Sequence, residues 1–316
     1  MFKIVKGKFG DFHSTTLLNS KLGICVEIIQ DFGAIINQYR VNHSPFSFIV
    51  GYQDSQNVIQ SHPFFSRSAK LFPFPNRLKN GQYHYRGHDY RLPANFPWSE
   101  HAVHGLLYNQ PFQVVETDAQ EHFATARFRY ETNHLADGFP FAFRLDVCYH
   151  IDETGRLRCY TEIINTGESP FPYGDAWHPY FSLGDSLAQC LLSLSPHQEV
   201  VHRDDLPTGE YTSNTALRSP TTLADVTLNH CYRFHQSSDQ SLTLTRADQQ
   251  ARLDYQQGAN YPFIQLYTPA SEPSIAIEPM SCPADAFNNH MGLLELNPEQ
   301  TAQFEWQCHA HYQPRR

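Results

Sequence analysis

The sequence is poor in charge and lacks the basic patterns of nucleic-acid-binding proteins. Only 17% of its 316 residues are charged, which is low for a helical protein, and the formal net charge is −9. No run of Lys and Arg is interleaved with aromatic residues, and the nearest basic cluster, residues 314–316, has the character of a solvated tail. Because nucleic-acid binders carry a basic face, we expect no nucleic-acid partner.

Long apolar runs and paired cysteine motifs are also missing. The first ten residues lack the apolar core of a signal peptide, and no apolar stretch approaches membrane-spanning length. The seven cysteines are scattered and include no CxxC pair, so neither a zinc knuckle nor a thioredoxin-type site is indicated. Several lie in apolar runs, where a thiol packs as a small hydrophobic group. We expect a cytoplasmic protein with reduced cysteines and no membrane partner.

What the sequence does contain favours strands. Hydrophobic residues make up 41%, and 21 prolines and 17 tyrosines accompany them. Two-residue alternation predicts strands over 123–130 and 141–147, a hairpin is predicted around the turn at 31–33, and only 285–294 could form a short helix. Many short strands joined by turns are typical of a β-sandwich. We therefore expect an all-β fold, a large antiparallel β-sandwich, as a single domain over residues 1–316.

One segment, residues 175–184, sets a histidine among flat rings. His178 lies between Trp177 and Pro179, and Tyr180 follows. The proline restricts His178 to an extended backbone, so the imidazole projects from an extended segment or strand end. We predict that Trp177 and Tyr180 either wall a ring-shaped ligand or hold the His178 ring, which would move a proton. The alternative is a structural histidine bonded to backbone, the usual state of one histidine among 18.

Two other segments contain polar residues in positions that are unusual for a core strand. Residues 72–81 contain two X-Pro steps that hold the chain extended and present Asn76 and Arg77 side by side. An arginine fork suits vicinal hydroxyls as well as carboxylates, although a surface arginine beside a turn would look the same. Glu278 ends an apolar run, where burial raises the pKa of a carboxyl towards the range of a general base. Its alternative is a buried glutamate paired with an arginine.

Several histidine pairs do not have the pattern of a metal site. His101 and His104 form an HxxH pair, but no carboxylate or cysteine follows at ligand spacing. His84 and His88 are equally isolated, and the histidines of residues 309–311 lack the partners of a cupin. We predict no metal ligands.

The segments named above occur in the order of a known family. The chain resembles the aldose 1-epimerases, or galactose mutarotases, from about Gly33 to about Trp306. The elements that look like the family's motifs are Asn76-Arg77 with Gly81 and Tyr83, Val103-His104-Gly105, His178-Pro179-Tyr180-Phe181-Ser182-Leu183, Gln265-Leu266-Tyr267-Thr268 and Ile277-Glu278-Pro279. Val103 replaces the usual leucine and Leu106 replaces a second glycine. The resemblance implies a galactose mutarotase-like supersandwich.

The resemblance also implies an activity and a role for each matching residue. The reaction would interconvert the α and β anomers of a free aldose such as glucose or galactose, with neither a metal nor a redox cofactor. Glu278 would be the general base for the C1 hydroxyl and His178 the acid that protonates the ring oxygen. His104 would bind substrate and support charge at the ring oxygen. The residues that would bind sugar hydroxyls are Asn76, Arg77 and Gln265.

One position departs from the family pattern. The family's substrate-binding aspartate lies in an element that looks like residues 228–232 here, so Asn229 takes its place. Asparagine can donate and accept hydrogen bonds but carries no charge. In another register Asp225 would substitute for it. Strict preference for galactose is therefore not expected.

Two other functions stay open at this point. A hexose 6-phosphate 1-epimerase would need basic groups near the far end of the sugar, for which the chain offers Lys70, Lys79, Arg86 and Arg91. A non-catalytic carbohydrate-binding protein of the same fold would not need both His178 and Glu278. We rank the free-sugar epimerase first, acting as a monomer or homodimer on a small-molecule sugar.

Overall fold

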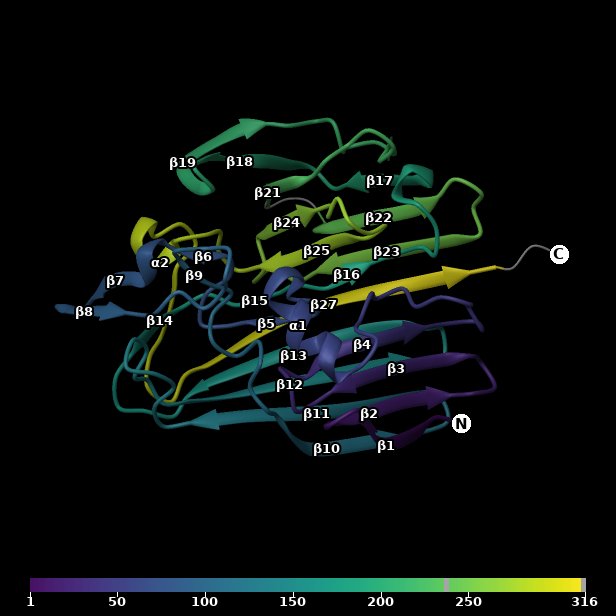
Figure 1. The fold of residues 1–316 in the computed structure, drawn as a ribbon, viewed down its shortest axis with the longest axis horizontal. Coiled ribbons are helices and arrows are strands. Elements are labelled where there is room, and N and C mark those ends of the chain that lie inside the picture. The colour runs from purple at the N-terminus through teal and green to yellow at the C-terminus, as the bar shows by residue number, and fades with distance from the viewer. Residues whose placement is uncertain (236–238, 314–316) are drawn as a thin grey trace.

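The structure is a computed structural model that describes residues 1–235 and 239–313. The basic cluster at 314–316 lies outside the described residues. Antiparallel sheets dominate the molecule, which confirms the predicted all-β fold (Figure 1). Within the described ranges no helix is long and apolar enough to cross a membrane.

The largest sheet has nine strands, and its long central strands cross the middle of Figure 1. In spatial order its strands are β10 (Gln113–Ala119), β11 (Phe123–Thr132), β12 (Phe143–Asp152), β13 (Arg156–Asn165), β27 (Thr301–Tyr312), β23 (Ala251–Gln257), β22 (Ser241–Arg246), β17 (Cys190–Leu194) and β20 (Thr221–Thr222). The strands predicted from alternation at 123–130 and 141–147 are β11 and β12.

A second sheet of eight strands carries the histidine segment singled out in the sequence. Its order is β19 (Leu206–Ser213), β18 (His197–Arg203), β21 (Asn229–Phe234), β24 (Phe263–Tyr267), β25 (Ile275–Met280), β15 (Ala176–Trp177) and β5 (Lys70–Leu71), with β16 (Tyr180–Phe181) also paired to β25. Every residue of β25 is buried, and the strand has neighbours along both edges, β24 on one and β15 and β16 on the other. β25 therefore lies at the centre of the fold.

Smaller sheets complete the architecture. A four-stranded sheet contains β1 (Lys3–Phe9), β2 (Phe12–Asn19), β3 (Ile24–Ile29) and β4 (Ile35–Arg40). The turn between β3 and β4 confirms the hairpin predicted at 31–33. Three two-stranded sheets pair β14 (Phe171–Tyr173) with β26 (Leu294–Leu296), β6 (Arg77–Leu78) with β9 (Ala102–Val103), and β7 (Gln82–Tyr85) with β8 (His88–Arg91).

The chain forms one helix that the sequence did not reveal. α1 (Ser55–Phe65) begins at Asp54, whose side chain accepts a hydrogen bond from the Asn57 N–H, and ends at Ser66. It buries only Ser55, Val58 and His62, so it has little apolar periodicity, and it includes a proline. The expectation of no helix in this region was wrong for that reason. The other helix, α2 (Ala286–Asn289), falls in the predicted segment; two 3₁₀ turns span Lys79–Gly81 and Leu187–Gln189.

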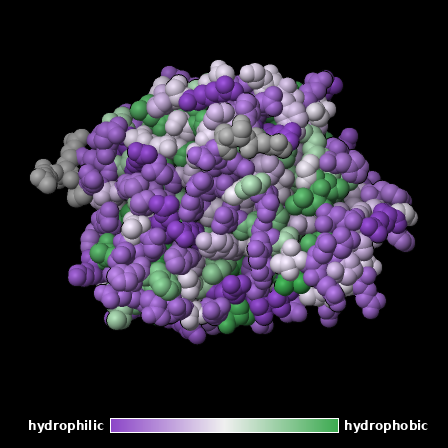
Figure 2. All heavy atoms as spheres, turned by 180° about the vertical axis from the view of Figure 1, so that it is seen from behind, coloured by the Kyte–Doolittle hydropathy of each residue, from purple (hydrophilic) through white to green (hydrophobic). Residues whose placement is uncertain are grey.

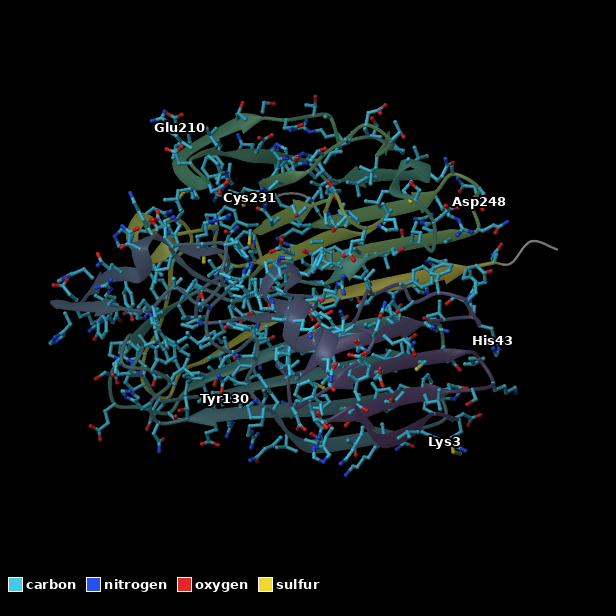
Figure 3. The ribbon with its side chains drawn as sticks, viewed as in Figure 1. Lys3, His43, Tyr130, Glu210, Cys231 and Asp248 are labelled. Atoms are coloured by element: carbon cyan, nitrogen blue, oxygen red, sulfur yellow. The ribbon has the colours of Figure 1, made fainter. Side chains whose placement is uncertain are left out.

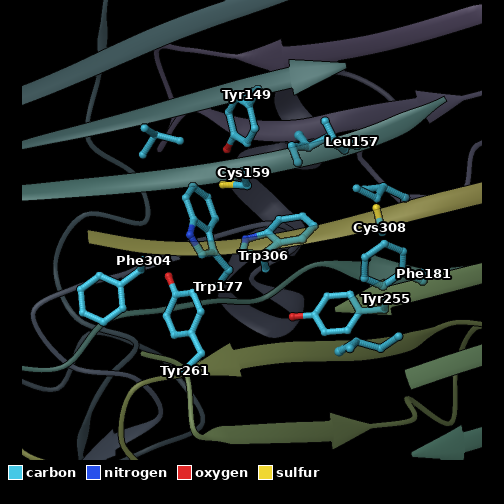
Figure 4. Close-up of a cluster of buried hydrophobic side chains, with 14 of the residues drawn as sticks. Tyr149, Leu157, Cys159, Trp177, Phe181, Tyr255, Tyr261, Phe304, Trp306 and Cys308 are labelled. Atoms are coloured by element: carbon cyan, nitrogen blue, oxygen red, sulfur yellow. The ribbon is translucent and has the colours of Figure 1, made fainter. Parts of the chain in front are cut away.

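One hydrophobic cluster joins the inward faces of the three large sheets. Figure 4 shows its centre, where Trp177 and Trp306 lie among Tyr149, Tyr255 and Tyr261. All seven cysteines are free: Cys25 and Cys148 are half-buried and the other five are buried. Outside the core, the face seen in Figure 2 is predominantly hydrophilic, with hydrophobic residues scattered over it.

A charged pair is buried behind the histidine segment. The Lys70 ammonium lies 2.5 Å from the Asp175 carboxylate, and both side chains are fully buried. Tyr261 donates a hydrogen bond to the same carboxylate, and the Lys70 ammonium lies 4.7 Å from the centre of a ring of Trp177. Because a buried charge without a partner is costly, this pairing fixes β5 against β15.

Candidate active site

Strand register brings His178 and Glu278 together. β15 and β16 pair with β25 in a single antiparallel register, in which His178 stands opposite Glu278. The His178 Nε2 atom lies 3.4 Å from Glu278 Oε1. On the other side of β25, β24 places Gln265 directly across from Glu278. Three residues from three separated segments thus project from one face of the sheet.

Burial sets the protonation of the His178–Glu278 pair. The two residues are 6% and 2% exposed. Burial raises the pKa of Glu278 well above its usual value, and the nearby Arg77 guanidinium offsets part of that rise. Burial lowers the pKa of His178 to about 4. The pair therefore keeps a neutral imidazole beside a carboxyl of raised proton affinity, which is the tuning that proton-transfer sites use.

Both members of the pair retain polar atoms that need partners. Glu278 Oε2 and His178 Nδ1 are buried and make no hydrogen bond to any described residue. Two rings hold the imidazole in place: Tyr180 stacks on it at 5.1 Å between centroids, and His104 meets it edge-on at 5.0 Å. Buried polar atoms without partners are rare in folded proteins, so these two atoms are available to hydrogen-bond a ligand.

His104 reaches the site from a strained loop. Its backbone N–H donates to the Asn76 carbonyl at 2.7 Å, and both residues have positive φ, 59° and 52°. Gly105 follows at φ 67° and packs so closely on Phe72 that a Cβ there would lie 2.2 Å from the Phe72 carbonyl oxygen. Burial lowers the pKa of His104 well below its usual value, with His178 and Arg77 contributing. Its buried Nδ1 makes no hydrogen bond to a described residue.

Arg77 is held at the edge of the same cluster. Its Nη1 donates to Asn76 Oδ1 at 2.9 Å, and its guanidinium lies 5.5 Å from the ring of Trp98. Its Nη2 lies 3.2 Å from Asp205 Oδ2, at the turn between β18 and β19. Trp98 and Asp205 could not be found from the sequence, because neither belongs to a motif and both come from segments remote from Arg77.

Gln265 is joined to Asn229, the position that departs from the family pattern. Gln265 Nε2 donates to Asn229 Oδ1 at 2.9 Å, across β24 and β21. Asp225, the other residue considered for this position, is exposed in a turn before β21. The structure therefore brings Asn229, and not Asp225, to the cluster.

Trp177 is a correction to the predicted site. Side chains alternate between the two faces of a strand, so the neighbour of His178 points to the opposite face. The Trp177 indole is 1% exposed, packs 6.0 Å from Tyr149 and donates to the Thr161 hydroxyl. It lies in the core between the sheets (Figure 4) and does not wall a ligand. Tyr180, the other ring predicted to do so, does contact His178.

The remaining histidine pairs stay apart from the cluster. His101 Nδ1 accepts a hydrogen bond from the Asn80 N–H, so only His104 of the HxxH pair faces His178. His309 and His311 lie in β27, although from the sequence they were expected to belong to a C-terminal tail. Among residues 1–235 and 239–313, no three His, Cys, Asp or Glu side chains are arranged to hold a metal ion.

Comparisons with known proteins identify a family and a fold. A family model described as aldose 1-epimerase matches residues 15–309. The uncharacterized protein YihR of Escherichia coli K12 is 28% identical over 238 residues, which cover 72% of this chain and 73% of that protein.

Solved structures agree with the sheet topology. A galactose mutarotase-like protein from Clostridium acetobutylicum superimposes with a TM-score of 0.88 at 16% identity, over 99% of both chains. Galactose 1-epimerase from Lactobacillus acidophilus NCFM gives a TM-score of 0.81 at 16% identity, again over 99% of both chains. At these identities the likeness establishes the galactose mutarotase-like fold.

Proposed function

This chain belongs to the aldose 1-epimerase family, and on that premise we propose that it interconverts the α and β anomers of a free aldose such as glucose or galactose. The observation that carries the proposal is the contact between Glu278 and His178, 3.4 Å apart and buried, each with an unpartnered polar atom. Anomer exchange needs one base and one acid beside the same carbon atom, and this pair supplies both.

The proposed reaction transfers one proton from the sugar to Glu278 and another from His178 to the sugar. The Glu278 carboxylate takes the proton of the C1 hydroxyl, the bond between C1 and the ring oxygen breaks, and protonated His178 gives its proton to the ring oxygen. Both oxygens are bonded to C1, so an adjacent base and acid reach them together. After the open-chain aldehyde rotates, the two residues exchange roles and the ring closes to the other anomer.

The surrounding residues suit sugar hydroxyls. We propose that His104 binds beside the ring oxygen, because its imidazole meets His178 edge-on and has a buried nitrogen without a described partner. Arg77 and Asn76 offer donors at one side of the pair. Gln265 and Asn229, bonded to each other on the other side, offer amide donors and acceptors without adding charge. Trp177 has no part in the proposal.

The two other functions considered from sequence have less support. Lys70, one basic residue considered for a phosphate site, is fully buried and paired with Asp175. Arg86 bonds Glu295 at the β7–β8 hairpin. A protein that only binds sugar would not need a carboxyl and an imidazole buried against each other. An uncharged aldose is therefore the substrate class that we propose.

The proposal is tested by following mutarotation of freshly dissolved α-D-glucose and α-D-galactose with a polarimeter. Wild-type protein should accelerate mutarotation of at least one sugar above the buffer rate. The Glu278→Gln variant should lose about 100-fold or more in kcat, the range that a positioned acid or base contributes. Binding of the sugar, measured by NMR titration, should survive the substitution.

A matched variant separates this effect from a general loss of acidic charge. Glu305→Gln makes the same change at an exposed residue of β27, in the other large sheet, and should keep wild-type rates. Equal loss in both variants, or an inert wild type that still binds sugars, would contradict the catalytic proposal and favour a sugar-binding protein.

A further inference from the structure

The turn between β18 and β19 places a carboxylate on the arginine of the site. Arg203 pairs with Leu206, so Asp204 and Asp205 form a two-residue turn, and both have positive φ, 51° and 63°. Aspartate, asparagine and glycine favour such turns because they tolerate this backbone region. The turn brings the Asp205 carboxylate to 3.2 Å from the Arg77 guanidinium.

Arg77 connects this carboxylate to the catalytic pair. Arg77 pairs with Val103, the residue before His104, and the His104 ring meets that of His178 at 5.0 Å between centroids. The Trp98 ring lies against the Arg77 guanidinium. The Trp98 indole N–H donates a hydrogen bond to the Pro63 carbonyl, which holds the ring in place. A ligand at Glu278 therefore meets an arginine whose charge is already balanced by Asp205.

The arm formed by β18 and β19 adds more negative charge. Residues 197–213 contain four acidic side chains and one basic one, and Glu210 lies on β19 at the outer edge of the molecule (Figure 3). The Asp205 side chain is 62% exposed, whereas that of Arg77 is 22% exposed. The Asp205 carboxylate is thus more open to solvent than the guanidinium that it contacts.

We propose that Asp205 is a specificity-determining residue that restricts this site to uncharged aldoses and disfavours those that carry a carboxylate or a phosphate. The Asp205 carboxylate balances the charge of Arg77, so that the guanidinium attracts an anionic substituent less strongly. The carboxylate also repels such a substituent directly. The guanidinium still offers its remaining N–H groups to neutral hydroxyls. This inference rests on the proposed function and narrows its substrate class.

The test compares sugars that differ in charge but hardly in shape. D-Galactose and D-galacturonate differ only in a CH₂OH or a carboxylate at C6, and D-glucose and D-glucuronate form a second such pair. Anomer exchange is measured for each by NMR. Wild-type protein should prefer the neutral sugar by about 10-fold or more in kcat/KM, as expected for like charges a few ångström apart near a protein surface.

The Asp205→Asn variant should reduce this preference by about 5-fold to 10-fold, chiefly through a lower KM for the uronate. Asparagine keeps the turn geometry, because it also tolerates positive φ. Asp204→Asn is the matched control: it removes the same charge from the same turn but not from Arg77, and it should leave the preference within about 2-fold of wild type. High salt should weaken the wild-type preference, since exposed charges are screened.

Several outcomes would overturn the inference. They are equal handling of the neutral sugar and its uronate by wild-type protein, an unchanged preference in Asp205→Asn, or the same change in both variants. Failure of the proposed function has a different signature, because it appears as no exchange of any neutral aldose. In that event NMR titration of the same sugar pairs still measures whether Asp205 selects against negative charge.

Discussion

At the scale of single residues, Glu278 and His178 form one buried pair in contact. Their side chains touch, and burial moves their proton affinities in opposite directions: the pKa of Glu278 rises and that of His178 falls to about 4. The singly protonated pair contains one proton that can lie on either group. It becomes a carboxylate beside an imidazolium, the form that begins ring opening, by an internal proton transfer.

This coupling predicts the pH dependence of the rate. Below about pH 4 a second proton binds and removes the base, so kcat/KM should fall as the pH decreases through the pKa of His178. As the pH increases through the raised pKa of Glu278, the last proton leaves and the acid is lost, so the rate should fall again. Polarimetry corrected for buffer catalysis measures the profile. A rate that rose steadily into alkaline solution would contradict the shared-proton assignment.

At the scale of elements, the loop after β9 positions His104 through one glycine. Gly105 has positive φ and approaches the Phe72 backbone so closely that any Cβ would clash. Gly105→Ala should therefore lower the free energy of unfolding by about 2 kcal/mol or more and reduce kcat at least 10-fold, because the neighbouring His104 must move. Chemical denaturation and polarimetry measure the two effects.

Gly87 provides the control for that substitution. It also has a positive φ, 82°, but a Cβ there would have no heavy atom within 4 Å. Gly87→Ala thus carries the backbone strain without the collision, and should cost about 1 kcal/mol with no change in kcat. If the two variants lost equal amounts of unfolding free energy and kcat, backbone strain alone would explain the effect of Gly105→Ala. The close contact of Gly105 with Phe72 would then be irrelevant.

At the scale of the whole molecule, buried histidines link stability to pH. His62, on α1, is 1% exposed and its Nδ1 contacts the Tyr52 hydroxyl at 2.7 Å. Burial lowers the pKa of His62 to about 3, and His104 and His178 are lowered as well. A histidine that is harder to protonate when folded contributes stability above its unfolded pKa, near 6.5, and this contribution is lost as the pH falls.

Lowering the pH should therefore destabilise wild-type protein more than a variant in which His62 is replaced. Between about pH 7 and about pH 4.5, wild-type protein should lose about 2–3 kcal/mol more unfolding free energy than His62→Gln does. Urea denaturation at the two pH values gives the difference. His88→Gln, a change at an exposed histidine of β8, should lose as much as wild type. Parallel losses in all three proteins would contradict the assignment.

Local patterns in the sequence were enough to locate several of the strands, and the roles predicted for the site residues stay predictions. Alternation located β11 and β12. The X-Pro step at Pro179 agrees with the place of His178 between β15 and β16, whereas the steps before Asn76 lie in a bent segment with a cis Phe72–Pro73 bond. Local patterns could not locate α1, whose buried residues are too few to give a helical period. The single-domain organisation, the cytoplasmic location and the monomeric or homodimeric state stay predictions.

The sequence shows which chemical groups are present: a glutamate ending an apolar strand, a histidine before a proline, and an arginine after an asparagine, in the order of one family. Only the tertiary structure decided which of these groups meet. The register of β15 and β16 on β25 sets His178 on Glu278, and the same two-residue period sends Trp177 into the core. The contact of Asp205 with Arg77 depends on where the β18–β19 hairpin, remote in sequence, places its turn at the edge of the sheet, which no local pattern records.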